Sequence, residues 1–144
     1  MNTNQLIEVL NNVYPSTIPK WGVMTPAQMF QHNSKFIDLY LGKQKVSPLL
    51  RFFGQCFGKF FLNYVKKQPY NKVVKGLKTI KSMKASDSAD FEFEKQELIH
   101  RLQNIDQIKG KINSSIYGYL DAEEVRYLIH HHLKYHLFQF SMIE

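Results

Sequence analysis

The residues of this sequence best suited to chemistry are its six histidines. His132 and His136 stand four residues apart within the segment 121–140, so on a helix both side chains project from one face, a turn apart. The same stripe carries apolar residues and one amide, namely Val125, Leu128, Ile129 and Gln139. Because the apolar stripe of a helix faces the core, we expect both imidazoles to point inward.

A third histidine is expected to face inward from another helix. His32 shares its stripe with Met29, Phe36 and Leu39 in the segment 25–41. Three neutral imidazoles from two facing helices suit a divalent metal ion and leave one coordination position for water or substrate. Such an ion lowers the pKa of bound water, which makes hydroxide available near neutral pH. Spacing alone leaves open the alternative that these histidines are hydrogen-bonded core residues.

The other three histidines are expected outside this cluster. His100 has polar neighbours on its helix and should face solvent. His130 lies between Arg126 and Lys134 and should be exposed as well. His131 lies between two tyrosines, which places it on the flank of the cluster.

Five helices are predicted to position these side chains, because apolar residues recur at helical spacing in five segments and no strand pattern persists. The segments are 4–13, 25–41, 48–67, 88–109 and 121–140, with a loop over 68–87. Gly42 is placed to end the second helix. The pattern is typical of an all-α helical bundle, and the 144 residues fit one domain over 1–144.

Two of the helices begin with recognisable capping residues. Thr25 is the expected N-cap of the second helix, with Pro26 at the first helical position and Gln28 as the partner in a capping box. Asp121 and Glu124 are expected to play the corresponding parts at the start of the last helix. With these two carboxylates assigned to a helix start, the histidine cluster has no evident general base.

The third segment, 48–67, is rich in Phe and Leu, and its helical spacing favours packing of these side chains in the core. Gly54 and Gly58 lie one turn apart, which allows another helix to approach closely. Cys56, the only cysteine, is expected to be a buried structural residue.

Cysteine usage and hydropathy bear on the compartment. A chain with one cysteine forms no intrachain disulfide, which fits a reducing, cytoplasmic environment. The first residues lack the features of a signal peptide. The most apolar run, 49–65, contains two basic residues and is too short to span a bilayer, so no membrane partner is expected.

Positive charge is concentrated in one stretch. The formal net charge is +7, and residues 43–84 hold eleven basic side chains and no acidic one: Lys43, Lys45, Arg51, Lys59, Lys66, Lys67, Lys72, Lys75, Lys78, Lys81 and Lys84. A solvated face that favours solubility explains such a stretch, and contact with a nucleic acid or an anionic surface is the alternative. From Lys72 to Lys84 the lysines recur every third residue, a spacing that fits neither an amphipathic helix nor a strand.

Two stretches at opposite ends of the chain resemble one known superfamily. The first is the run from Trp21 through the helix cap at Thr25-Pro26 to His32, and the second runs from Tyr117-Gly118-Tyr119-Leu120 to the ending His132-Leu-Lys-Tyr-His136-Leu-Phe-Gln-Phe140. Both resemble the DinB-like superfamily, and the second is similar to one uncharacterised subgroup of it. Tyr135 stands where that subgroup often has another histidine, and Ile129 stands where it often has a polar residue.

The resemblance implies a fold, a site and an activity. The fold would be a DinB-like four-helix bundle with a short additional N-terminal helix. The site would be a zinc or nickel centre whose ligands, carried over by position, are His32, His132 and His136, the same three residues that the stripe pattern selects. Relatives are thiol S-transferases or metal-dependent hydrolases, which implies a small-molecule substrate, such as a low-molecular-weight thiol, and in many members a homodimer.

Three functions therefore stand as hypotheses. The first is a metal-dependent thiol S-transferase or hydrolase, and the missing general base favours thiol transfer. The second is a non-catalytic helical bundle that binds a small ligand and uses its histidines structurally. The third is binding of a nucleic acid or an anionic surface through residues 43–84, although no recognised nucleic-acid motif is present.

Overall fold

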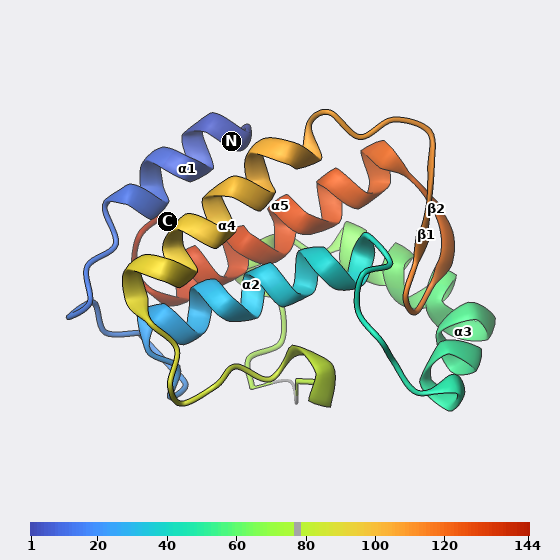
Figure 1. The fold of residues 1–144 in the computed structure, drawn as a ribbon, viewed down its shortest axis with the longest axis horizontal. Coiled ribbons are helices and arrows are strands. Elements are labelled where there is room, and N and C mark those ends of the chain that lie inside the picture. The colour runs from blue at the N-terminus through green and yellow to red at the C-terminus, as the bar shows by residue number, and fades with distance from the viewer. Residues whose placement is uncertain (77–78) are drawn as a thin grey trace.

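The computed structural model describes residues 1–76 and 79–144, and Figure 1 shows their arrangement. Five α-helices and a two-stranded hairpin make up the regular structure of these residues. In chain order they are α1 (Thr3–Asn11), α2 (Pro26–Tyr40), α3 (Pro48–Lys67), the single 3-10 turns η1 (Tyr70–Lys72) and η2 (Lys81–Met83), α4 (Phe91–Ile105), β1 (Lys111–Ser114), β2 (Gly118–Asp121) and α5 (Ala122–Gln139). The prediction of a mostly helical chain is confirmed.

The start of α2 is formed by the capping box that the sequence predicts. The Thr25 hydroxyl accepts from the Gln28 backbone N–H at 3.2 Å, and the Gln28 side chain accepts from the Thr25 N–H at 3.0 Å. Asp121 is the N-cap residue of α5 with extended backbone, but its side chain makes no capping hydrogen bond. Glu124 instead pairs with Lys66 of α3, so the predicted capping pair of α5 is wrong in its side-chain contacts.

Four helices share the main core. α2 packs on α4 and α5, and α1 also packs on α4 and α5, so each of the four has two neighbours (Figure 1). The core includes fully buried side chains from all four, among them Leu6, Leu10, Met29, Phe30, Leu98, Leu102, Ile129 and Leu137. Burial of these apolar surfaces is the main force that holds α2, with His32, and α5, with His132 and His136, in place.

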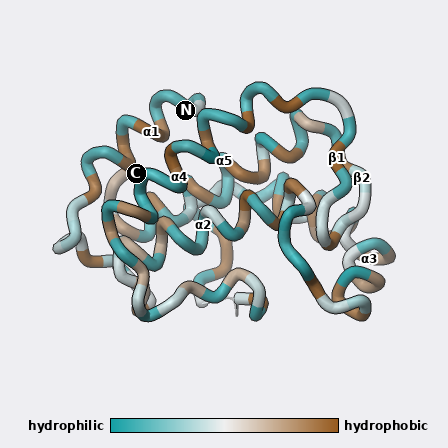
Figure 2. Tube along the Cα trace, viewed as in Figure 1, coloured by the Kyte–Doolittle hydropathy of each residue, from teal (hydrophilic) through white to brown (hydrophobic). Residues whose placement is uncertain are grey.

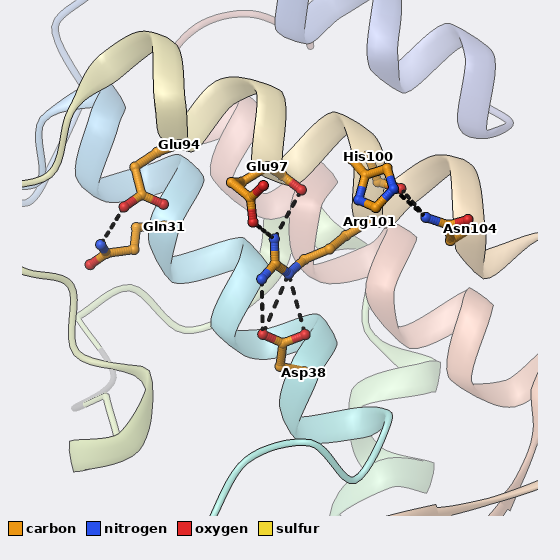
Figure 3. Close-up of polar contacts among 7 residues, drawn as sticks. All are labelled: Gln31, Asp38, Glu94, Glu97, His100, Arg101 and Asn104. Atoms are coloured by element: carbon orange, nitrogen blue, oxygen red, sulfur yellow. Dashed lines mark hydrogen bonds and ion pairs between the residues drawn. The ribbon is translucent and has the colours of Figure 1, made fainter.

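Polar contacts fix α4 against α2 at the edge of this core (Figure 3). The Arg101 guanidinium donates to the Asp38 carboxylate of α2 at 3.3 Å and to Glu97, one turn earlier on α4, at 2.6 Å. All three side chains are partly exposed, so solvent screens these ion pairs and we expect them to orient the helices more than to stabilise them.

The hairpin was not expected from the sequence, which predicts no strand. β1 and β2 pair antiparallel, with Ile112 opposite Leu120 and Ser114 opposite Gly118. Strands of four residues are too short to give a readable alternation of apolar and polar side chains. The hairpin occupies the chain between α4, which ends at Ile105 rather than near 109, and α5.

α3 has the predicted bounds but not the predicted environment. It lies at one end of the molecule beside the hairpin, apart from the four packed helices (Figures 1 and 2). Only Gly58 and Leu62 of this helix are buried, so the prediction that its aromatic side chains pack in the core is wrong. Cys56 is exposed, which also corrects the expectation of a buried cysteine.

The two glycines of α3 do permit a close approach, but to the hairpin rather than to another helix. A Cβ added at Gly54 would lie 2.1 Å from Ile116, and one added at Gly58 would lie 2.5 Å from the Tyr117 ring. Both contacted residues belong to the turn between β1 and β2. Larger side chains at these positions would therefore separate α3 from the rest of the molecule.

The predicted loop over 68–87 contains the two 3-10 turns and no longer element among its described residues. Residues 77–78 of that loop, and with them Lys78 of the lysine repeat, lie outside the described part of the chain. Of the helices described, none combines the length and the apolar character needed to cross a bilayer.

Candidate metal centre

The three histidines selected from the sequence lie together in the structure. α2 supplies His32, and α5 supplies His132 and His136 from adjacent turns. One ring nitrogen from each lies within 4.8 Å of the other two, and the ring centroids are 4.7–5.1 Å apart. His32 and His136 are 4% and 5% exposed, and His132 is half-buried. The inward stripes of the two helices therefore meet as the sequence predicts.

Hydrogen bonds determine which nitrogen of two rings carries the proton. The Nδ1–H of His32 donates to the backbone carbonyl of Met83 at 3.0 Å, since a carbonyl oxygen only accepts. The Nδ1–H of His136 donates to Oε1 of Gln139 at 2.8 Å, and the amide of Gln139 is itself oriented by donating to the Trp21 carbonyl at 2.7 Å. Both rings consequently present the lone pair of Nε2 to the centre of the cluster.

The third ring completes the cluster. Nε2 of His132 lies 3.0 Å from Nε2 of His32, and because the latter carries no proton, His132 donates in the metal-free protein. The ring of His132 stacks on Phe36, with centroids 3.7 Å apart and planes 2° from parallel, which holds its orientation. Transfer of its proton to Nδ1 turns the third Nε2 into a lone-pair donor as well.

A divalent transition metal fits these residues. Nε2 of His136 is buried and has no hydrogen-bond partner, an arrangement that costs free energy unless something else occupies the lone pair. Zinc and nickel sites use three imidazole nitrogens of this kind as ligands. Two of the three rings are held here through Nδ1–H, one by a backbone carbonyl and one by a side-chain amide oxygen.

Burial keeps these imidazoles neutral. Removal from water, together with the neighbouring His32, lowers the pKa of His136 to about 3, against which its hydrogen bond to Gln139 acts. Burial, and then the charges of His136 and His32, lower the pKa of His132 well below its usual range. Burial also lowers the pKa of His32, partly offset by its bond to Met83. At neutral pH all three rings can therefore donate lone pairs.

The cluster lies in the wall of a cavity of about 550 Å³. The lining is mainly aromatic and aliphatic and comes from α2, α3, α5, the hairpin turn and described residues of the loops at 21–24 and 73–83. Its aromatic members include Phe36, Tyr40, Phe53, Phe57, Tyr117 and Tyr135. None of the described residues in this lining is Asp or Glu. None of these described lining residues therefore supplies a carboxylate base next to the histidines.

The remaining histidines have separate roles. His100 is exposed, as predicted, and accepts from Asn104 on the outer face of α4 (Figure 3). His130 is half-buried rather than exposed, because its ring lies 3.1 Å from the Thr3 hydroxyl of α1. His131 is buried, lines the cavity and donates to the carbonyl of Gln68, which fastens the chain after α3 to α5.

Two supporting groups of the cluster were missed at the level of sequence. The Met83 carbonyl comes from η2, fifty-one residues after His32, and no residue type marks a backbone acceptor. The Trp21 carbonyl that orients Gln139 is equally invisible. Gln139 itself could have been assigned, because it follows His136 by three residues on the same helical face.

Gln139→Leu tests this support. We expect it to weaken zinc affinity by about 10- to 100-fold, because His136 loses the acceptor that holds its tautomer and ring orientation. Competition with a chromophoric chelator measures the affinity, and Gln103→Leu, at an exposed position of α4, is the matched control. Equal zinc affinity in the two variants would show that the Gln139 contact has no influence on the site.

Comparison of the chain with protein-family models, with curated proteins and with solved structures finds no match. The DinB-like resemblance therefore remains a prediction from the two sequence stretches, and the metal site is inferred from the geometry of the three histidines.

Proposed function

We propose that this protein is a metal-dependent enzyme of the DinB-like type, a thiol S-transferase or hydrolase with a zinc or nickel ion held by His32, His132 and His136. The observation that carries the proposal is the convergence of three imidazole nitrogens, one of them buried without a partner, on the wall of an apolar cavity. Such a cavity with a few convergent polar groups is typical of a small-molecule site.

The packing of the helices supports a four-helix bundle. α1, α4, α2 and α5 form a closed ring of contacts in that order, which is the arrangement of a bundle with two diagonal pairs. In this proposal the short α1 is a member of the bundle and α3 is the addition, the reverse of what the sequence suggested.

A divalent ion in this site would supply Lewis-acid activation of a thiol or a water molecule toward an electrophilic substrate. The chain's own contribution is to hold three neutral imidazoles with their lone pairs directed inward, through Met83 and Gln139. The apolar lining excludes water and accommodates the substrate. Because the described lining has no carboxylate base, the proposal favours a thiol, which loses its proton on coordination, over water.

The first experiment is elemental analysis of the tag-free protein together with His132→Ala. We expect about one zinc or nickel ion per chain in the wild type and a loss of nearly all of it in the variant, since two imidazoles hold such an ion far less well than three. His100→Ala, at an exposed histidine of α4, is the control and should keep the metal.

A wild-type protein that takes up no metal, even on reconstitution, would remove the metal-dependent enzyme. A protein that binds metal in the cavity but transfers no thiol and hydrolyses no electrophile would instead be the non-catalytic binder. Circular dichroism of each variant separates loss of the site from loss of the fold.

A further inference from the structure

α3 presents an apolar surface that nothing in the described chain covers. Seven large hydrophobic side chains of this one helix are at least half exposed: Leu49, Phe52, Phe53, Phe57, Phe60, Phe61 and Tyr64. Phe60 is 79% exposed, and Phe52, which points further round the helix, is 60% exposed. We call these seven side chains the α3 face. A monomeric protein rarely leaves such a contiguous patch in water, so the face indicates an interaction site.

α3 is amphipathic, as helices that bind at a membrane surface are. At 100° per residue the members of the α3 face cover about half of the helix circumference, and Lys59 lies at the edge of that half, next to Phe52. Arg51 lies on the other side of the helix, where its guanidinium donates to Asn113 of β1. The opposite side is the one attached to the protein, through Gly54, Gly58 and Leu62. Part of the α3 face, namely Phe53, Phe57 and Phe61, lines the cavity, and the other four members lie outside its lining.

Positive charge is concentrated in the stretch of chain that contains this helix. Residues 43–84 carry eleven basic side chains and no acidic one, and nine of those basic residues are exposed: Lys43, Lys45, Arg51, Lys59, Lys67, Lys72, Lys75, Lys81 and Lys84. From outside the stretch, Glu124 pairs with Lys66, and Asp121 lines the same small cavity as Lys59. A partner that matches this surface must offer both an apolar interior and negative charge at its surface.

We propose that α3 docks on an anionic lipid surface, with the α3 face inserted among the acyl chains near the headgroups. The exposed lysines on the helix and directly before it would lie at the lipid phosphates: Lys43, Lys45, Lys59 and Lys67. Phenylalanine and leucine side chains supply the apolar burial that holds an interfacial helix, and lysine stems reach from its edge and ends to the headgroup layer. The docking is peripheral, consistent with the absence of a bilayer-spanning helix among those described.

Two other partners suit the surface less well. A second copy packed through the same face would bring two basic stretches together without a carboxylate between 43 and 84 to neutralise either. A single-stranded nucleic acid would need basic side chains interleaved on the stacking surface, whereas Lys59 lies at the edge of the α3 face and Lys67 lies beyond its last aromatic residue, Tyr64.

The mouth of the cavity adjoins this surface. Phe53, Phe57 and Phe61 belong to the α3 face and also line the cavity that contains the histidines. An apolar ligand would thus enter the cavity from the lipid side. The docking itself needs no metal, so it stands or fails independently of the proposed function.

The test is co-sedimentation of the full chain with phosphatidylglycerol–phosphatidylcholine vesicles and with pure phosphatidylcholine vesicles. We expect binding to the anionic vesicles that weakens as salt is raised, and little binding to the neutral ones. The double variant Phe52→Ser/Phe60→Ser, which leaves the cavity lining intact, should weaken binding by about tenfold or more, since each lost Phe removes apolar burial. Phe93→Ser, at a 62% exposed Phe of α4, is the matched control and should bind as the wild type does. His132→Ala should also bind normally.

Three results would overturn the proposal. The first is absence of binding to anionic vesicles at low salt. The second is a dimer in sedimentation equilibrium that the Phe52→Ser/Phe60→Ser variant dissociates, which would assign the face to a second copy. The third is salt-dependent binding of a single-stranded oligonucleotide, lost in the same variant, without any vesicle binding.

Discussion

Zinc or nickel added to the metal-free protein should raise the midpoint of thermal unfolding by about 10 °C when the ion is present at about a thousand times its dissociation constant. At that ratio, an ion that binds the native state alone stabilises it by about 4 kcal/mol, and a chain of this size gains roughly 2–4 °C per kcal/mol. The native state alone brings His32 of α2 within 4.8 Å of the two nitrogens of α5. In the unfolded chain, one hundred residues separate His32 from His132.

His136→Ala is the decisive variant for this effect. It removes the imidazole whose Nε2 is buried without a partner, and it should abolish the rise in midpoint, whatever it does to the midpoint of the metal-free protein. Differential scanning calorimetry with and without the ion gives both values for each protein, and His100→Ala should respond as the wild type does. A rise of the same size in His136→Ala would place the bound ion somewhere other than this cluster.

The histidine cluster could be predicted from sequence because it depends on helical periodicity alone. Once the apolar stripes of the two helices face one core, His32, His132 and His136 share the space between them. What orients the rings could not be predicted in the same way. The acceptor for His32 is a backbone carbonyl in a 3-10 turn, and the position of that turn is set by packing over the whole chain.

The environment of α3 shows the limit of periodicity more clearly. The spacing of apolar residues shows that a helix has an apolar face, but it does not show what covers that face. Nothing in the described chain covers Phe52 and Phe60. The glycine pair at 54 and 58 correctly indicated a close approach of another segment to α3. That segment is the turn of the hairpin, which could not be predicted because its strands are too short to leave a pattern in the sequence. The prediction that Cys56 is buried was wrong for the same reason, since it was inferred from the expected burial of the neighbouring aromatic residues.

Gly42→Ala should lower the free energy of unfolding by about 3 kcal/mol, because this residue follows the end of α2 and packs directly against the hairpin. Its φ is +73°, in the left-handed region where a Cβ is strained, and the added Cβ would lie 2.3 Å from the backbone oxygen of Asn113 in β1. A backbone oxygen in a paired strand moves only if the hairpin moves. The hairpin is also held by the Ser115 N–H, which donates to the Leu39 carbonyl at 3.0 Å, so the strain cannot relax locally.

Gly110→Ala separates the two causes of this loss. Gly110 has almost the same φ, +74°, but a Cβ there meets nothing within 4 Å, so the variant should cost only the backbone strain of about 1 kcal/mol. Urea unfolding of both variants measures the difference, which reports the contact between the end of α2 and β1 alone. Equal losses in the two variants would mean that the hairpin does not sit against α2. The turn residues Ile116 and Tyr117 would then also have no fixed position in the cavity wall or against α3. The two variants therefore test the geometry on which both the candidate metal site and the α3 face depend.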